Sequence, residues 1–337
     1  SNLYNVGIDL SMWKGMLSVE FDVFYRKRTG LLATRAQSLP GTFGASLPLE
    51  NLNSDSNRGF ELVMSHRNKL QNGLNYSIKG NVSYTRAKYN HVERTESVNQ
   101  YRDWRDNSNN RWKNIHWGYK AIGQFKSYEE IASSPVQDGK GNTTLRPGDI
   151  KYQDYNGDNV IDDNDVHVIG RGNTPEIMYG IELAADWKNF DISIFMQGAA
   201  NFNAYFENQL AVPFFNGESS LKAFTDRWRR EDIYDPNSAW IPGKYPSTYA
   251  SGSENNKKHS SFWLQNASYL RIKEIQLGYS IPKPICKKIA MENIRLFVSG
   301  YNLFTFTSMK LLDPEAASSN GRYYPQQKIL SFGFNLT

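Results

Sequence analysis

The sequence contains one cysteine, five histidines and no long apolar segment. The lone Cys286 cannot form an intrachain disulfide, and no histidine has a cysteine or a second histidine at metal-ligand spacing. No segment approaches the roughly 18 uninterrupted apolar residues of a transmembrane helix, which excludes spanning by helices. The formal net charge is only +5 over 337 residues, and basic residues are scattered among acidic ones. This charge pattern argues against a nucleic-acid-binding protein.

Apolar side chains recur at every second position in several segments. Between residues 4 and 13, for example, Val6 and Ile8 alternate with Gly7 and Asp9. A period of two with charges on the second face predicts strands with one apolar and one wet side. Most of these segments have about 9–12 residues, which matches the roughly 9–11 that a tilted strand needs to cross a bilayer. Nine strands are predicted, at residues 4–13, 17–27, 60–67, 74–84, 177–187, 190–196, 269–281, 294–303 and 329–337, and a change of phase near residues 273–274 predicts a β-bulge.

The connections between these strands alternate between short and long. The short ones lie at residues 13–15, 68–73, 187–189 and 282–293, and the long, polar ones at residues 29–58, 90–175, 200–266 and 304–328. Short periplasmic turns and long outer loops are typical of an outer-membrane β-barrel. A soluble β-sandwich is the alternative, but its strands usually have about 5–6 residues and it gives no reason for this alternation. Bacterial single-chain barrels have an even number of strands, so nine strands predict a part of a barrel.

Short motifs along almost the whole chain resemble the C-terminal part of SusC/RagA-type TonB-dependent outer-membrane transporters of Bacteroidetes. The matching stretches are residues 5–11, 24–32, 57–62, 148–158, 162–165, 169–170, 174–176, 190–193, 267–273, 277–279 and 299–304. The resemblance implies an all-β fold, namely the last nine or so strands of a 22-strand transmembrane antiparallel β-barrel. We expect residues 1–337 to supply barrel wall and long extracellular loops, with the plug domain absent from this sequence.

The same resemblance implies a function in the bacterial outer membrane. Such transporters import oligosaccharides or peptides, are energised by TonB, and work with a SusD-like surface lipoprotein. The resemblance therefore implies four partners, namely that lipoprotein, the TonB complex through the missing N-terminal part, the solute, and outer-membrane lipid. A passive porin or a surface glycan-binding outer-membrane protein is the alternative. No nucleophile–base arrangement predicts an enzyme, and no cofactor is required.

One loop has the spacing of a calcium site. Six residues place oxygen donors at positions 1, 3, 5, 7, 9 and 12 of a twelve-residue loop: Asp154, Asn156, Asp158, Val160, Asp162 and Asp165. Position 6 is Asn159 where glycine is usual, and position 12 is an aspartate where glutamate is usual. A polar surface turn held by side-chain-to-backbone hydrogen bonds is the alternative. A structural calcium ion and a plain turn both remain open.

Two further sets of residues are candidates for contact with a solute or a partner. Loop aromatics that could stack on sugars or dock a partner are Trp104, Trp112, Trp117, Tyr205, Phe214 and Trp240, although for any one of them a place in a small loop core is the favoured interpretation. By the parity of the strands, the polar residues Glu20, Asp22, Lys79, Asp191 and Gln197 face the lumen. Trp13 and Trp187 lie at strand ends, where an interfacial aromatic girdle is expected.

Overall fold

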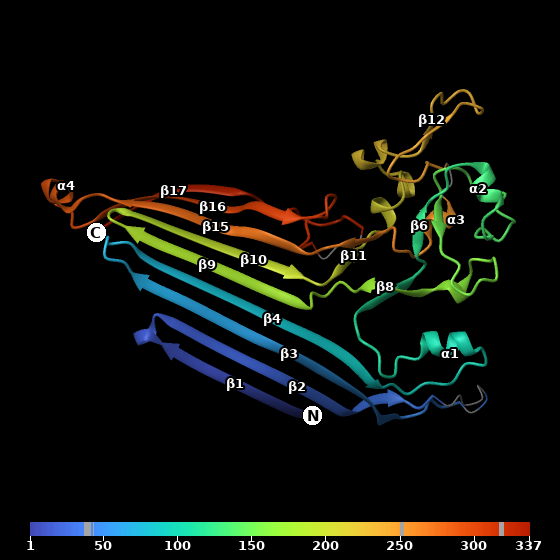
Figure 1. Cartoon of the computed structure of the whole chain (residues 1–337), viewed down its shortest axis with the longest axis horizontal. Coiled ribbons are helices and arrows are strands. Elements are labelled where there is room, and N and C mark those ends of the chain that lie inside the picture. Colours follow the sequence, from blue (N-terminus) through green and yellow to red (C-terminus); the bar gives the residue numbers. More distant parts are fainter. Residues whose placement is uncertain (37–41, 43, 250–252, 317–319) are drawn as a thin grey trace.

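The computed structural model of the chain describes residues 1–36, 42, 44–249, 253–316 and 320–337. Its main element is one antiparallel sheet of nine strands in the order β1-β2-β3-β4-β9-β10-β15-β16-β17 (Figure 1). The strands are β1 (Asn2–Met12), β2 (Leu17–Thr34), β3 (Leu49–Lys69), β4 (Asn75–His91), β9 (Ile177–Trp187), β10 (Phe190–Ala200), β15 (Tyr269–Ser280), β16 (Ile294–Thr307) and β17 (Ile329–Leu336). Consecutive sheet strands are neighbours throughout, which confirms the nine predicted strands and their order.

The register of the sheet confirms the predicted alternation of faces. Asp9 lies opposite Glu20, and Lys79 lies opposite Glu182, so polar residues share one face across neighbouring strands. The predicted bulge is also present. Glu274 pairs with Phe195 and Ile272 pairs with Met196, which leaves the residue between them outside the pairing. That extra residue restores the apolar parity of β15 after its change of phase.

The first predicted loop is much shorter than residues 29–58. The hairpin of β2 and β3 continues to Thr34 and begins again at Leu49, so the predicted strand at 60–67 is the end of a strand of 21 residues. The alternation did not predict this extension, because Leu31 and Leu32 are adjacent in β2, where the pairing is irregular, and residues 50–58 of β3 are polar except for Leu52. Similarly, β16 runs on to Thr307, past the predicted boundary at residue 303. Parts of three predicted loops, at residues 37–41, 43, 250–252 and 317–319, lie outside the described residues.

The apolar face of the sheet is exposed from one edge to the other. Val23, Ile78 and Leu277 are 46%, 47% and 51% exposed, and Phe332 on the last strand is 80% exposed. Soluble monomers rarely expose a contiguous apolar surface of this extent, since its contact with water is unfavourable. A β-sandwich would cover this face with a second sheet, and the described part of the chain contains no such layer. The sandwich alternative is therefore excluded.

The hydrophobic core lies mainly in the long connections, and the sheet contributes Ala199 and Tyr269 at its loop end. In the described residues, these loops contain four two-stranded sheets, three short α-helices and several 3-10 turns. They gather at one end of the sheet, while the short turns and α4 (Lys283–Lys288) lie at the other (Figure 1). The loop elements are α1 (Gln100–Asp106), β5 (Ile115–Gly118), β6 (Ala121–Gln124), α2 (Tyr128–Ala132), β7 (Ile150–Tyr152), β8 (His167–Arg171), β11 (Asn203–Tyr205), β12 (Arg229–Arg230), β13 (Trp240–Ile241), α3 (Glu254–Lys257) and β14 (Leu264–Asn266). Ile150, Tyr152, Phe202 and Trp263 are among the residues buried in this core.

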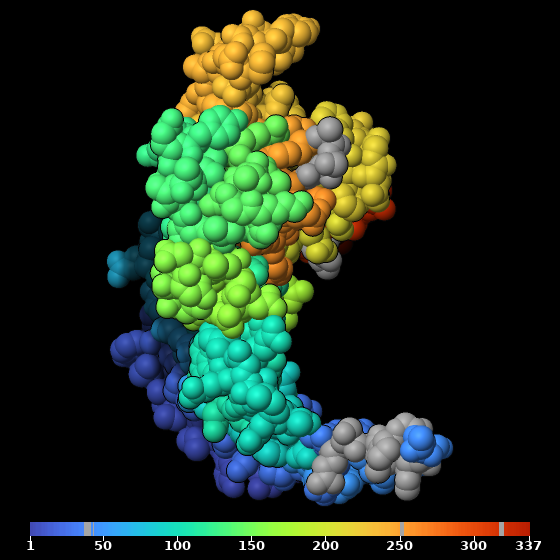
Figure 2. All heavy atoms as spheres, turned by 90° about the vertical axis from the view of Figure 1, so that its right-hand side faces the viewer, coloured from blue at the N-terminus to red at the C-terminus, as the bar shows by residue number. Residues whose placement is uncertain are grey.

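Seen from the loop end, the loops stack along an arc that is open on one side (Figure 2). On the polar face of the sheet, a cavity of about 470 Å³ is lined by residues of β2, β3, β4, β9 and β10. The polar face is therefore hollowed, as expected for the inner face of a curved wall. Among the described residues, no helix has the length and apolar character needed to cross a bilayer.

Candidate functional site

A second cavity lies where the sheet enters the loops. Its volume is about 550 Å³, which is within the usual range for a small-ligand pocket. Met178, Ala199 and Tyr269 contribute from β9, β10 and β15, and all three lie on the polar face by register. The loops supply the remaining lining: His116, Asn173, Pro175, Phe202, Asn203, Ala204, Tyr205, Glu207, His259, Pro314, Glu315 and Ala316. We call this space the mouth cavity.

A stack of three rings forms one wall of the mouth cavity. The Tyr205 ring stacks on the His259 ring at 3.8 Å between centroids, and the His116 ring lies 5.5 Å from that of His259. The pairing of β5 with β8 positions His116, and the pairing of β11 with β14 positions Tyr205. His259 is held by its backbone, because its carbonyl accepts a hydrogen bond of 2.8 Å from the amide of Tyr119.

Burial sets the protonation of these rings. Burial lowers the pKa of His116 and of His259 from 6.5, and for His259 the neighbouring His116 lowers it further. Burial also raises the pKa of Tyr205 to about 12. At neutral pH the wall is therefore uncharged, with flat rings and polar edges that can stack on a sugar or on a peptide group and form hydrogen bonds.

The lining of the mouth cavity also includes a charged group, Glu315. Glu315 accepts hydrogen bonds from Arg271 at 3.1 Å and from Lys273 at 2.8 Å. The Arg271 side chain is only 3% exposed and also binds Asp313 at 2.6 Å. These contacts tie the described part of the connection between β16 and β17 to the wall of the sheet, so ion pairs hold Glu315 beside the mouth cavity.

The predicted loop aromatics lie in different places. Tyr205 is the one that lines the mouth cavity. Trp104 and Trp117 pack edge to face at 5.6 Å, with the guanidinium of Arg111 over both rings at 5.0 and 4.9 Å. Trp112 lies under two guanidinium groups, those of Arg58 at 4.6 Å and Arg86 at 4.2 Å. In these positions the tryptophans support the loops through cation–π contacts.

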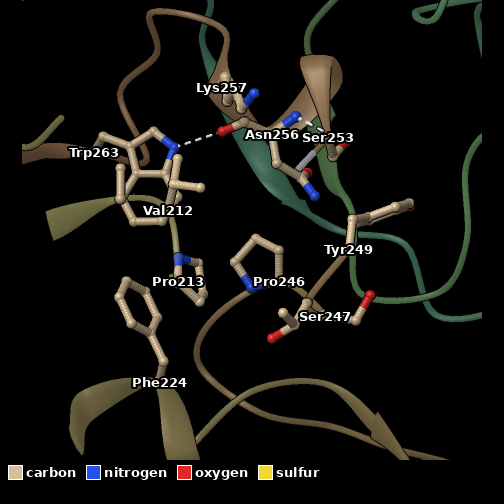
Figure 3. A pocket seen from close by; sticks show the side chains of 12 residues that line it. Val212, Pro213, Phe224, Pro246, Ser247, Tyr249, Ser253, Asn256, Lys257 and Trp263 are labelled. Atoms are coloured by element: carbon tan, nitrogen blue, oxygen red, sulfur yellow. Dashed lines mark hydrogen bonds between the residues drawn. The ribbon is translucent and has the colours of Figure 1, made fainter. Parts of the chain in front are cut away.

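The other two predicted aromatics are also outside the mouth cavity. Trp240, on β13, has the guanidinium of Arg230 at 4.4 Å from its ring centre. Phe214 is 60% exposed. A hollow near Phe214, lined by Val212, Pro213 and Trp263 among others, has a volume of only about 30 Å³ (Figure 3). This volume is far below the 550 Å³ of the mouth cavity, so the hollow is too small for a solute.

The five residues predicted to face the lumen share the polar face of the sheet. Glu20 and Lys79 line the cavity of about 470 Å³ there, together with Glu182. Asp22 lies one position along the same face of β2, opposite Glu61. Asp191 accepts two hydrogen bonds from Arg295, at 2.9 and 2.5 Å, near the short-turn end. Gln197 lies at the other end, opposite Arg271.

In the loop at residues 154–165, the carboxylates bind the loop's own backbone. Asp154 accepts from the amides of Gly157 at 2.7 Å and Asn159 at 2.9 Å. The fully buried Asp165 accepts from the amides of Tyr155 at 2.7 Å and Asp162 at 3.0 Å. Within the described ranges, no group of three or more His, Cys, Asp or Glu residues is arranged to hold a metal. This arrangement favours the plain turn, and calcium binding stays a prediction from the spacing alone.

Calorimetry can decide between a calcium site and a plain turn. If the turn is complete without metal, titration of the intact protein with calcium up to about 1 mM is expected to release no heat, since even weak extracellular calcium modules bind in that range. Asp158→Asn and Asp162→Asn serve as controls that remove charge from two of the six donors. Binding heat in the native protein that these variants lose would establish the calcium site.

The two cavity histidines were missed by reasoning from sequence. His116 and His259 are far apart along the chain, and only the packing of two separate loops brings their rings together. The spacing rules for metal or catalytic histidines describe neighbours on one element and contain no signal for such a pair. Asn203 was also missed. Its side chain accepts a hydrogen bond of 3.0 Å from the amide of Arg171, which joins β11 to β8.

No family model matches the chain, but sequence comparisons find relatives over its whole length. TonB-dependent receptor P26 of Formosa agariphila is 26% identical over 357 aligned positions, which cover 100% of this chain and 34% of the receptor. TonB-dependent receptor SusC of Bacteroides thetaiotaomicron is 22% identical over 99% of the chain and 31% of its own length. The chain thus spans about a third of the length of the curated relatives it matches.

Solved structures share the fold. The RagAB peptide transporter matches with a TM-score of 0.69 and 19% identity, over 99% of this chain and 34% of that chain. The RagAB peptide importer in its closed-closed state matches with a TM-score of 0.67. At this identity the match establishes the nine-strand architecture and not the ligand.

Proposed function

Because the chain is homologous over its whole length to the C-terminal third of SusC/RagA-type TonB-dependent receptors, we propose that it forms wall and outer loops of an importer of oligosaccharides or peptides. TonB-dependent receptors are outer-membrane proteins, and the relatives are named as receptors and not as enzymes. The observation that supports import best is the position of the mouth cavity. It lies between the outer loops and the polar face, on the path of a solute that enters along the inner wall.

Partners of the whole protein follow from the same homology. The structural match is to a two-component transporter, RagAB. We infer that a SusD-like surface lipoprotein covers the loop end of this protein, and that energy comes from the TonB complex through other parts of the protein. The arc of loops in Figure 2 offers a broad surface for such a lid.

The cavity lining suits an uncharged or mildly polar solute. Stacked rings favour a sugar ring or a peptide plane, and Asn203 provides an amide that can bind either one. The Oε2 atom of Glu315 already accepts from Arg271 and Lys273, which offsets its charge, and its buried Oε1 atom has no hydrogen-bond partner among the described residues and could accept from a solute hydroxyl or amide. Both solute classes therefore stay within the proposal.

Uptake assays with the full-length receptor test the proposal. Replacing Tyr205 with alanine removes one ring of the stack, and we expect the concentration for half-maximal uptake of the cognate oligosaccharide or peptide to rise about threefold to tenfold. Phe214→Ala, which removes an exposed aromatic outside the cavity, is the matched control and is expected to leave uptake unchanged. Surface amounts of each variant are measured with an epitope tag.

Dependence of uptake on TonB distinguishes active import from a passive porin and from a surface glycan-binding protein. Deleting TonB is expected to abolish uptake while solute binding persists. Uptake that continues without TonB would identify a passive porin, and binding without any uptake would identify a surface glycan-binding protein. Either result would overturn the proposal.

A further inference from the structure

The four short connections of the sheet share one chemical pattern. Each carries lysine next to an exposed apolar side chain, as in the pairs Trp13–Lys14 and Trp187–Lys188. In the second connection Lys69 precedes Leu70, and the fourth is α4 with its flanking residues. We call the residues 12–16, 68–74, 186–190 and 281–293 the short-turn rim. All four connections lie at the same end of the sheet (Figure 1).

The apolar part of the short-turn rim is exposed to an unusual degree. The exposed fractions are 66% for Trp13, 39% for Leu70, 43% for Trp187, 55% for Phe190, 52% for Ile285 and 56% for Ile289. Cys286 is the buried residue of α4, whereas Ile285 in α4 and Ile289 directly after it are more than half exposed. Leu277 and Leu296, each about half exposed, continue the same apolar surface onto the sheet.

The charged part of the short-turn rim is strongly basic. It contains six lysines, at positions 14, 69, 188, 283, 287 and 288, against two acids, Asp186 and Glu292. Asp186 is engaged by a hydrogen bond of 2.6 Å from the side chain of Asn75. Within the part of the chain that the structure describes, none of the six lysines forms an ion pair. The ammonium of Lys188 lies 4.3 Å from the centre of the Trp187 ring, so the cation and the aromatic ring lie side by side on the rim.

We propose that the short-turn rim binds the phosphate groups of anionic phospholipids in the leaflet that faces the short turns. The apolar side chains continue the lipid-facing surface, so they reach the edge of the hydrocarbon, and the lysines beside them reach the headgroups. Each unpaired lysine at this level adds its own electrostatic attraction for anionic lipid. The densest cluster, Lys283, Lys287 and Lys288 on α4, forms the main contact.

Lipid selectivity of the full-length receptor in vesicles tests this surface. Spin-labelled phosphatidylglycerol and spin-labelled phosphatidylcholine are compared by electron paramagnetic resonance for association with the protein. We expect the native protein to prefer phosphatidylglycerol at least about threefold, and the preference to fall as salt is raised, since charge attraction is screened. Equal association of the two lipids would overturn the proposal.

Two sets of variants locate the contact. In the triple variant Lys283→Gln, Lys287→Gln and Lys288→Gln we expect most of the preference to be lost. The matched control changes three exposed lysines of the loops at the other end, Lys126→Gln, Lys140→Gln and Lys222→Gln, and is expected to keep it. If the triple variant does not insert, the pair Lys14→Gln and Lys188→Gln replaces it, with a smaller expected loss. An unchanged preference in the rim variants would place the lipid contact elsewhere. Solute uptake is not part of this readout, so the result is independent of the proposed transport function.

Discussion

Replacement of Arg271 by methionine is expected to destabilise the attachment of the connection between β16 and β17 by about 3–5 kcal/mol, because it removes a buried cation and leaves the partly buried Asp313 without a partner cation and Glu315 with Lys273 alone. The Arg271 side chain is 3% exposed and binds Asp313 at 2.6 Å and Glu315 at 3.1 Å. It also donates to Thr305 at 2.9 Å and to Gln326 at 2.5 Å. One side chain thus joins β15, β16 and both described ends of this connection.

Limited proteolysis of the full-length receptor measures the effect. In the Arg271→Met variant, cleavage within residues 308–328 is expected to become faster than in the native protein by about two orders of magnitude or more, because cleavage follows the population of the open form. Arg295→Met is a matched control. It removes an arginine that pairs with Asp191 at the other end of the sheet, so it is expected to leave this connection protected. Native resistance in Arg271→Met would show that apolar packing, and not the ion pairs, holds the segment.

The sheet was predictable from sequence because a bilayer imposes a strict pattern on it. Every strand must present apolar side chains to lipid at alternate positions, and this signal survives without any tertiary information. Even the bulge near residue 273 was visible, since Ile272 and Ile275 are out of phase. Where a strand extends beyond the bilayer, this requirement no longer applies and the alternation of apolar residues ends. The extension of β2 and β3, which lacks a regular alternation of apolar residues, is therefore predicted as a loop.

The loops were not predictable to the same degree. Their core is assembled from distant segments, and its members, such as Phe202, Tyr245 and Trp263, have no shared periodicity. The stack of Tyr205 with His259 depends on two small sheets and on backbone hydrogen bonds between separate loops. The spacing of the predicted calcium ligands is visible in the sequence. It does not show that the carboxylates of Asp154 and Asp165 already accept hydrogen bonds from backbone amides.

Substitution of Asp149 is the second change with a large expected effect. This carboxylate is completely buried in the loop body. It accepts hydrogen bonds from the Tyr249 hydroxyl, from the Asn256 amide at 2.8 Å and from the backbone of Arg146 at 3.0 Å. Asp149→Ala leaves three buried donors without an acceptor, and we expect a loss of about 3–6 kcal/mol in the free energy of opening of the loop body. Asp149→Asn keeps the shape but turns an N–H₂ group toward one donor, so a smaller loss is expected.

The pH dependence identifies this carboxylate. Burial raises the pKa of Asp149 above its ordinary 3.8, against the effect of its hydrogen bonds. The folded state therefore holds the proton more tightly than the unfolded state. The contribution of Asp149 to the stability of the loop body is fully present below pH 3.8 and is lost as the pH rises through the folded pKa. Hydrogen exchange of residues 146–152, followed from acid to neutral pH, is expected to show this fall in the native protein and not in Asp149→Asn.

Asp138 gives a control of opposite sign in the same loop. Burial works against it, but hydrogen bonds from Thr144, Lys140 and Asn142 lower the pKa of Asp138 to about 2. Its contribution is therefore present above the ordinary pKa of 3.8 and is lost as the pH falls toward 2. Asp138→Asn should remove stability at neutral pH and spare it in acid, whereas the Asp149 effect runs the other way. If both variants changed the pH profile in the same direction, a general response of the loops to charge would explain the data, and the assignment to a single buried carboxylate would fail.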